Sequence, residues 1–176
     1  MKLYPTTIDG CFLIKSDSHF DLRGNFTKVY SESIFNKNGI NVKFNECFYS
    51  KSSKDTLRGM HFQEGPYGVG KLIYCVEGEI LDVFLDIRIK SKTFGLFESI
   101  SLSDDSGNAL FLPDGIAHGF LTKSSSSIVC YMQTGEYIKS ADSGILWNSF
   151  GMNWDCADPI LSDRDKSFIK LSEYKK

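Results

Sequence analysis

The sequence has few of the features that mark several common classes of protein. It contains no long run of basic residues, because its 20 Lys and Arg are interspersed with 22 Asp and Glu, for a formal net charge of -2. The sequence therefore predicts neither nucleic-acid binding nor a polybasic contact with a membrane. An anionic ligand would have to be bound by a few well-placed cations.

The five cysteines are widely spaced, and no two of them form a C-x-x-C pair. This odd, scattered set argues against a disulfide framework and against a structural zinc site. No stretch approaches the roughly 18 uninterrupted apolar residues of a membrane helix, and Met1 to Pro5 lacks the apolar core of a signal peptide. We therefore expect reduced thiols and a soluble, cytoplasmic protein.

Helical periodicity is scarce, and we find no internal repeat and no linker between domains. Fourteen Phe and eight Tyr, with glycines dividing the chain into short runs, favour an all-β fold. Strands are predicted at 10–14, 25–30, 42–50, 57–63, 71–76, 79–87, 94–102, 109–112, 119–123 and 127–134. Glu77-Gly78 is the best hairpin signal, and short helices are expected at 31–36 and within 161–171. This pattern predicts one domain over residues 1–176, a sandwich or double-sheet barrel.

The strand predicted at 79–87 shows a clear alternation. Apolar residues at 81, 83, 85 and 87 alternate with Asp82, Phe84 and Asp86. Because successive side chains point to opposite faces of a strand, we expect one apolar face on a core and one mostly polar face.

Ionisable residues lie inside or beside other strand-like runs, where core packing does not call for them. Arg58 and His61 belong to the run 56–63, Lys71 opens the next one, and His118 lies in the run 113–120. Such residues usually line a cavity. Each also has an ordinary alternative, such as a satisfied core histidine or a lysine stem along a barrel rim.

Pro113-x-Gly115-x-x-His118 is similar to the second signature of the cupin superfamily, whose members are small jelly-roll barrels. The first cupin signature needs His-x-His, whereas the corresponding stretch here is His61-Phe62-Gln63. Two histidines and one carboxylate could still hold a metal. A metal-free barrel is the better prediction.

Further motifs extend across nearly the whole chain: 21–24, 50–52, 57–63, 70–72, 82–88, 91–95, 113–120, Tyr131, 144–148 and 161–165. In this order they resemble one family, the dTDP-4-dehydrorhamnose 3,5-epimerases. The resemblance implies a cupin-like jelly roll with no metal and no cofactor. It also implies proton transfer on a nucleotide-linked 4-keto-6-deoxy sugar, inverting C5 and usually C3.

That chemistry needs three groups, because a C–H beside a ketone is acidic only when the enolate oxygen is stabilised. The site requires a base, a partner for the oxyanion, and an acid on the opposite face of the ring. The resemblance assigns these roles to His61, Lys71 and Tyr131. It assigns to Asp165 the task of fixing the tautomer of His61 and stabilising its charged form.

The resemblance also implies the contacts with the rest of the substrate. Arg58 would bind the pyrophosphate, for which a guanidinium is well shaped. The other substrate-binding residues predicted are Phe20, Arg23, Lys28, Phe48, Gln63, His118 and Glu136. A homodimer is expected, in which an N-terminal arm of about residues 1–30 carries Phe20 and Arg23 to the nucleotide in the partner's barrel.

One geometric problem accompanies these roles. Arg58 and His61 are three residues apart, so a regular strand would point them to opposite faces. Gly59 lies between them and is a natural place for a β-bulge. Alternatively, Arg58 enters the cavity from the very start of the strand.

The chain departs from the family pattern at three places that would contact ligand. Lys28 stands where the family usually has Glu, and Glu46-Cys47-Phe48-Tyr49 stands where it has a Gln-x-Asn-His pattern. Shortly after the tyrosine that matches Tyr131, the family has an aromatic residue that stacks on thymine, whereas this chain has Glu136 followed by Tyr137. Because the Glu136 carboxylate could accept both N1–H and the 2-amino hydrogens of guanine, we predict a GDP-linked hexose or heptose for surface polysaccharide biosynthesis.

The alternatives are that Tyr137 stacks on thymine in a dTDP-4-dehydrorhamnose 3,5-epimerase proper, or that only C3 or only C5 is inverted. More distant ones are a metal-dependent cupin oxygenase and a sugar-binding jelly roll.

Overall fold

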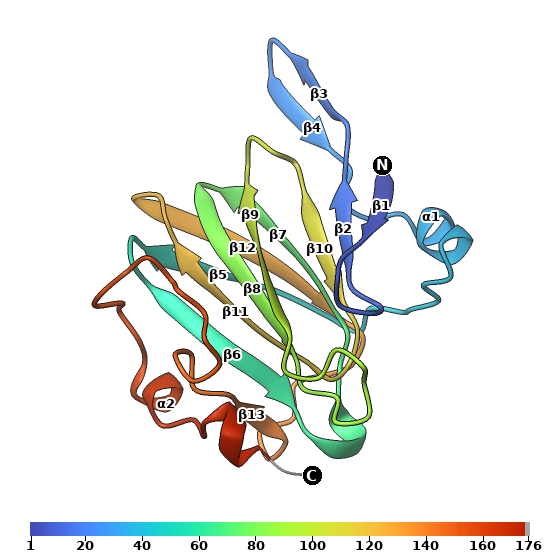
Figure 1. Cartoon of the computed structure of the whole chain (residues 1–176). Coiled ribbons are helices and arrows are strands. Elements are labelled where there is room, and N and C mark those ends of the chain that lie inside the picture. Colours follow the sequence, from blue (N-terminus) through green and yellow to red (C-terminus); the bar gives the residue numbers. More distant parts are fainter. Residues whose placement is uncertain (175–176) are drawn as a thin grey trace.

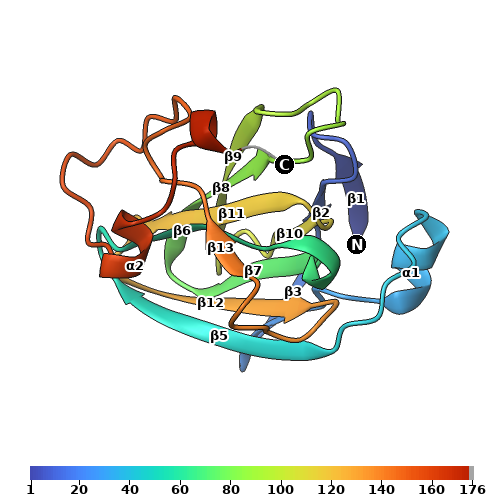
Figure 2. The ribbon, with the colours of Figure 1, turned by 90° about the horizontal axis from the view of Figure 1, so that it is seen from below.

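The structure, a computed structural model, describes residues 1–174, which form two facing antiparallel sheets and a projecting hairpin (Figure 1). The six-stranded sheet has the order β1-β2-β10-β7-β12-β5, and the five-stranded sheet has the order β13-β6-β11-β8-β9. Figure 2 shows the two sheets facing each other. The strands are β1 (Lys2–Pro5), β2 (Phe12–Lys15), β3 (Ser18–Asp21), β4 (Gly24–Thr27), β5 (Glu46–Ser53), β6 (Leu57–Gln63), β7 (Lys71–Glu77), β8 (Glu79–Asp86), β9 (Phe97–Ser103), β10 (Ala109–Leu112), β11 (Ile116–Thr122), β12 (Ser126–Gln133) and β13 (Asp142–Gly144). The predicted all-β jelly roll is confirmed.

The helices are few and short. Helix α1 (Glu32–Lys37) confirms the helix predicted at 31–36, although the side chain of its N-cap Ser31 makes no capping hydrogen bond. Near the C-terminus the chain forms α2 (Asp163–Lys166) and the 3-10 helix Leu171–Glu173, and another 3-10 turn spans Gly65–Tyr67. None of the helices formed by residues 1–174 has the length and hydropathy needed to span a bilayer.

The hairpin prediction at Glu77-Gly78 is wrong. Strands β7 and β8 flank Gly78, but β7 pairs with β10 and β12, whereas β8 pairs with β9 and β11. Gly78 has φ +78°, and it carries the chain from one sheet to the other. A local turn motif predicts that the chain changes direction, but it does not predict that the two flanking strands pair with each other. The partners of β7 and β8 include strands from distant parts of the sequence.

Three apolar clusters hold the layers together. One fills the barrel between the two sheets and includes Phe84 and Phe120; a second lies between the five-stranded sheet and the C-terminal segment and includes Val83 and Trp154. The third packs Phe35 of α1 on the outer face of the six-stranded sheet. Burial of one such side chain stabilises the fold by about 1.5–3 kcal/mol.

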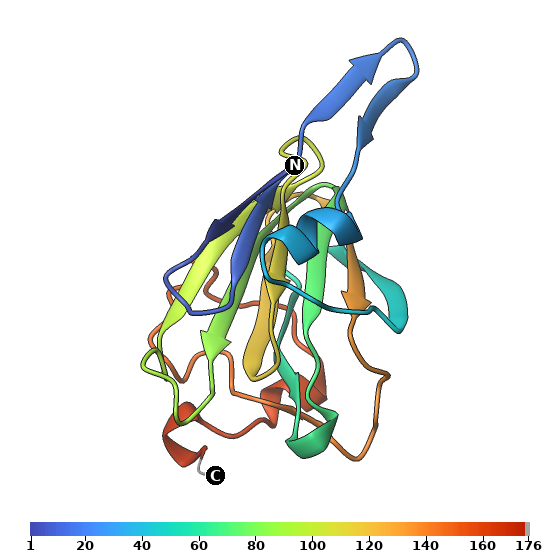
Figure 3. The ribbon, with the colours of Figure 1, turned by 90° about the vertical axis from the view of Figure 1, so that its right-hand side faces the viewer.

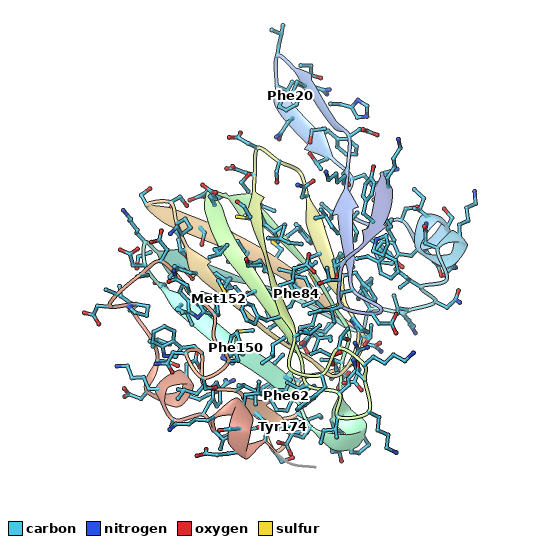
Figure 4. The ribbon with its side chains drawn as sticks, in the orientation of Figure 1. Phe20, Phe62, Phe84, Phe150, Met152 and Tyr174 are labelled. Atoms are coloured by element: carbon cyan, nitrogen blue, oxygen red, sulfur yellow. The ribbon has the colours of Figure 1, made fainter. Side chains whose placement is uncertain are left out.

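These clusters correct the expectation for strand β8. Its Val83 and Leu85 lie under the C-terminal segment, whose Phe150 and Met152 pack against the same cluster (Figure 4). On its other face, Asp82, Phe84 and Asp86 are all 0% exposed. Both faces are therefore buried, and the face with carboxylates looks into the barrel instead of into solvent.

The hairpin β3–β4 projects away from the two sheets (Figure 3). The sequence suggested a loop over most of this region, but Ser18–Asp21 pairs with Gly24–Thr27. Phe20 and Phe26 are 72% and 62% exposed, and Phe20 lies far from the body of the protein (Figure 4). An exposed hairpin with several large apolar side chains is a surface that a partner can cover.

Candidate active site

A cavity of about 380 Å³ lies between the two sheets and is large enough for a small-molecule ligand. Strands of both sheets line it, so its opposite walls carry different side chains. The predicted site residues among its lining are Phe48, Arg58, His61, Gln63, Lys71, His118 and Tyr131. The structure thus brings together most of the residues selected from the sequence.

His61 is held by a carboxylate from the distant C-terminal segment. Its Nε2 lies 2.9 Å from Oδ1 of Asp165, and the other carboxylate oxygen accepts the Gly59 N–H at 3.0 Å. Asp165 is 4% exposed, and its own N–H donates to the N-cap Ser162 of α2. The carboxylate is therefore fixed by the start of a helix on one side and by strand β6 on the other.

The charge states of this pair suit a general base. Burial lowers the pKa of His61 below 6.5, and this effect outweighs the opposing influence of Asp165. Burial also acts to raise the pKa of Asp165, but the hydrogen bonds from His61 and Gly59 lower it overall. At neutral pH the ring is thus neutral, with Nε2–H donated to the carboxylate and Nδ1 left with a lone pair.

Lys71 places a cation close to this histidine. Its Nζ donates to the backbone carbonyl of His61 at 3.1 Å, and the residue is 8% exposed. Burial lowers its pKa to about 8, against the opposing influence of Asp142 and Asp82. A partly desolvated ammonium is well placed to stabilise negative charge that develops on a ligand oxygen.

Tyr131 occupies the opposite wall, on strand β12 of the six-stranded sheet, and is 8% exposed. Burial raises the pKa of its hydroxyl, and the nearby Ser50 lowers it only in part. Tyr131 is therefore protonated at neutral pH and can donate a proton. His61 lies on the other sheet, so a ligand in the cavity meets a base and an acid from opposite sides.

His118 forms a second imidazole–carboxylate pair, which the sequence did not reveal. Its Nε2 lies 2.8 Å from Oδ2 of Asp82, and the other oxygen of this fully buried carboxylate has no hydrogen-bond partner among residues 1–174. The signal in the sequence was an Asp inside an apolar strand. The alternation of β8 places Asp82 on a mostly polar face, but it does not say whether that face is covered.

Arg164 and Asp142 also line the cavity and were not selected from the sequence. The two side chains form an ion pair at 2.9 Å, and the Tyr137 hydroxyl donates to Asp142 at 3.2 Å. Arg164 belongs to the motif 161–165 and directly precedes Asp165. Its place beside a residue with a predicted role is the sequence signal that could have identified it.

The geometric problem of Arg58 and His61 is resolved by a bulge at Gly59, as predicted. His118 pairs with His61 and Phe120 pairs with Arg58, so three steps along β6 match two steps along β11. Gly59 has φ +137°, and a Cβ there would lie 2.5 Å from the backbone of β11. Only glycine fits this position. The extra residue returns Arg58 to the cavity side.

Gln63 has a structural task at the cavity wall. Its amide nitrogen donates to the carbonyls of Tyr67 and Glu136, and its oxygen accepts the N–H of Ile138. It therefore fixes the loop that follows β12. Its role in substrate binding stays a prediction.

The structure does not bring every predicted residue to the cavity. The side chain of Glu136 is exposed and is not part of the lining, whereas Glu46 is. Glu46 accepts hydrogen bonds from the Tyr137 N–H at 2.8 Å and from Gln133 at 3.3 Å. The position of Glu136 therefore gives no support to the guanine contact expected of it.

Phe20, Arg23 and Lys28 also lie outside the cavity of their own chain. Phe20 and Arg23 belong to the projecting hairpin, where Arg23 forms an ion pair with Asp21, and Lys28 follows it as an exposed residue. Their part in substrate binding stays a prediction. Separately, no group of three or more His, Cys, Asp or Glu within residues 1–174 is arranged to hold a metal ion.

Comparisons with known proteins agree with this architecture. A family model described as dTDP-4-dehydrorhamnose 3,5-epimerase matches residues 5–173. A dTDP-4-dehydrorhamnose 3,5-epimerase of Methanothermobacter thermautotrophicus is 39% identical over 98% of this chain and 95% of its own length. A dTDP-4-dehydrorhamnose 3-epimerase of Streptomyces niveus is 33% identical over 98% of this chain and 85% of its own length.

A solved structure gives the same result. The dTDP-6-deoxy-D-glucose-3,5-epimerase of Legionella pneumophila, in complex with dTDP-4-keto-L-rhamnose, superimposes with a TM-score of 0.93 and 29% identity. The superposition covers 99% of this chain and 94% of that one.

Proposed function

The chain belongs to the dTDP-4-dehydrorhamnose 3,5-epimerase family, and from this premise we propose that it inverts C5 and C3 of a dTDP-linked 4-keto-6-deoxy sugar. The observation that carries the proposal is the placement of a neutral His61 and a protonated Tyr131 on opposite sheets facing one cavity. Epimerisation requires proton removal from one face of the ring and proton return to the other. Two groups on one wall could not do this.

In the proposed reaction, His61 takes the proton from the carbon beside the C4 ketone. The electron pair of the broken C–H bond forms the enolate, whose oxygen is stabilised by the Lys71 ammonium. Tyr131 then donates its proton to the opposite face of the same carbon, and its hydroxyl is restored by the proton that His61 releases. The cycle is repeated at the second centre, with no net change in electrons or protons.

The nucleotide proposed is dTDP instead of the GDP expected from the sequence. A relative with the same fold was solved with dTDP-4-keto-L-rhamnose, and the expectation of GDP depended on Glu136, which lies outside the cavity. Tyr137 lines the cavity and offers a ring that can stack on thymine. The Glu46 carboxylate accepts the Tyr137 N–H at 2.8 Å and so holds the backbone that carries this ring.

Calorimetry with the two nucleotides tests this choice. We expect dTDP to bind at least about tenfold more tightly than GDP, a difference of about 1.4 kcal/mol. As a control, Glu136→Gln should leave both affinities unchanged because its side chain is exposed. Tighter binding of GDP would restore the original prediction.

The reaction itself is tested by NMR in heavy water. The protein should incorporate solvent deuterium at C5 and at C3 of the dTDP-linked 4-keto-6-deoxy sugar and should release the doubly inverted product. A sugar-binding protein would incorporate none, and an oxygenase would lose its activity after chelation. Exchange at C3 alone would identify an enzyme like the 3-epimerase relative.

The pH dependence of kcat/KM should be bell-shaped. The acid limb should lie below pH 6.5, because burial lowers the pKa of His61 and a protonated ring cannot accept the substrate proton. The alkaline limb should lie near pH 8, where Lys71 loses its charge. Lys71→Arg, which keeps its charge, should remove the alkaline limb even if it lowers the rate. An unchanged limb would assign that titration to another group.

We also propose that the active form is a homodimer. The hairpin β3–β4 exposes Phe20 and Phe26, and neither Phe20 nor Arg23 lines the cavity of its own chain. A second copy would receive the hairpin beside its nucleotide. Sedimentation at micromolar concentration should give a dimer, and Phe20→Ser should weaken dTDP binding. A fully active monomer contradicts the shared site.

A further inference from the structure

Phe48 is the residue that lies directly against the proposed acid. Strands β5 and β12 pair with Phe48 opposite Tyr131, so both side chains point into the cavity. Their rings are stacked, with centroids 4.9 Å apart and an interplanar angle of 17°. A stacked pair of this kind favours one orientation of the tyrosine ring over others.

Tyr131 is restrained by more than this one neighbour. The ring of His118 meets it edge-on, with centroids 6.0 Å apart and an interplanar angle of 73°. Asp82 in turn holds His118 at 2.8 Å, so His118 cannot easily move away. The Tyr131 ring therefore packs between the His118 imidazole, which is held by Asp82, and the face of the Phe48 ring.

Core packing does not account for a phenylalanine at this position. Phe48 is 41% exposed and belongs to none of the three apolar clusters of the described residues. Its neighbours on the same side of β5, Glu46 and Ser50, are polar. The ring stacks on Tyr131 at the cavity wall, which indicates a role in the site.

The reaction gives this restraint a specific consequence. Inversion of two centres needs two rounds of enolisation, and the singly inverted ketone formed after the first round can either leave or react again. The outcome depends on two rates: the rate of proton return to the opposite face of the second centre, and the rate at which the singly inverted ketone leaves the enzyme. A misplacement of about 1 Å in a reacting group can reduce such a step by about 100-fold.

We propose that Phe48 is a positioning residue that holds Tyr131 against the sugar, so that both centres are inverted before the product leaves. This inference rests on the proposed function, since it concerns the balance between single and double inversion. Phe48 transfers no proton itself. It fixes the direction in which the Tyr131 hydroxyl points.

Phe48→Leu keeps an apolar side chain but removes the flat ring, and Phe48→Tyr keeps the stack. The matched control is Cys47→Ala, an exposed neighbour on the opposite face of the same strand. Each variant is incubated with dTDP-linked 4-keto-6-deoxy sugar in heavy water, and NMR reports total deuterium exchange and the ratio of doubly to singly inverted product. Far-UV circular dichroism and thermal unfolding confirm that each variant is folded.

For Phe48→Leu we expect total exchange within about threefold of the parent and a product ratio reduced by at least about fivefold, since only the acid is displaced. Phe48→Tyr and Cys47→Ala should keep the parent's ratio. An unchanged ratio in Phe48→Leu, or an equal loss of exchange and inversion, overturns this inference while leaving the proposed function intact. A parent protein with no exchange at all overturns both.

Discussion

Replacing His61 with Asn is expected to abolish both deuterium exchange and epimerisation, with a loss of at least about 10³-fold, because a positioned general base contributes about 10²–10⁴-fold. Asn has no group that can accept a carbon-bound proton. His118 also lines the cavity, but its Nε2 is hydrogen-bonded at 2.8 Å to the fully buried carboxylate of Asp82, and we do not expect it to replace the base. The measurement is NMR in heavy water.

A matched pair of variants separates the base from the fold around it. Asp165→Asn removes the carboxylate that holds His61 at 2.9 Å and should reduce exchange strongly, though less than loss of the base. Asp163→Asn makes the same chemical change on the same helix, at a fully exposed side chain, and should leave activity unchanged. Exchange by His61→Asn within a few fold of the parent would show that another residue removes the proton.

Replacing Tyr131 with Phe is expected to separate proton removal from proton return. His61 and Lys71 stay in place, so exchange should persist within about tenfold, whereas inverted product should fall by about 100-fold or more, the range expected for loss of a general acid. The ring itself is kept, so its stack on Phe48 and its contact with His118 are preserved. The comparison therefore isolates the hydroxyl.

The control for this substitution is Tyr67→Phe, the same change at a half-exposed residue outside the cavity. It should leave both exchange and inversion at the level of the parent. Equal losses of exchange and inversion in Tyr131→Phe would mean that the hydroxyl acts before proton removal, for example by binding the sugar.

The sequence by itself determined the fold class and pointed to part of the cavity lining. Short apolar runs separated by glycines and polar turns specify strands, because their local pattern fits a pleated, half-buried surface. Ionisable residues inside such runs singled out Arg58, His61, Lys71 and His118 as possible cavity residues. The resemblance to a known family was needed to add Tyr131 and to assign each residue a role. Even the bulge at Gly59 could be inferred, since a three-residue spacing and a shared cavity require one extra residue.

Only the tertiary structure decided which strands pair and which faces are covered. Gly78 could be predicted as a turn, but its two strands joined different sheets because their partners come from distant segments. The alternation of β8 was visible, yet it could not say that the C-terminal segment covers one face and the barrel encloses the other, with Asp82 beneath His118. For the same reason the sequence could not show that Glu46 lines the cavity, whereas Glu136, the residue predicted to contact the base, is not part of the lining. The two-residue period of a strand determines which side chains share a face. Which of the two faces meets solvent depends on contacts with residues that are distant along the chain.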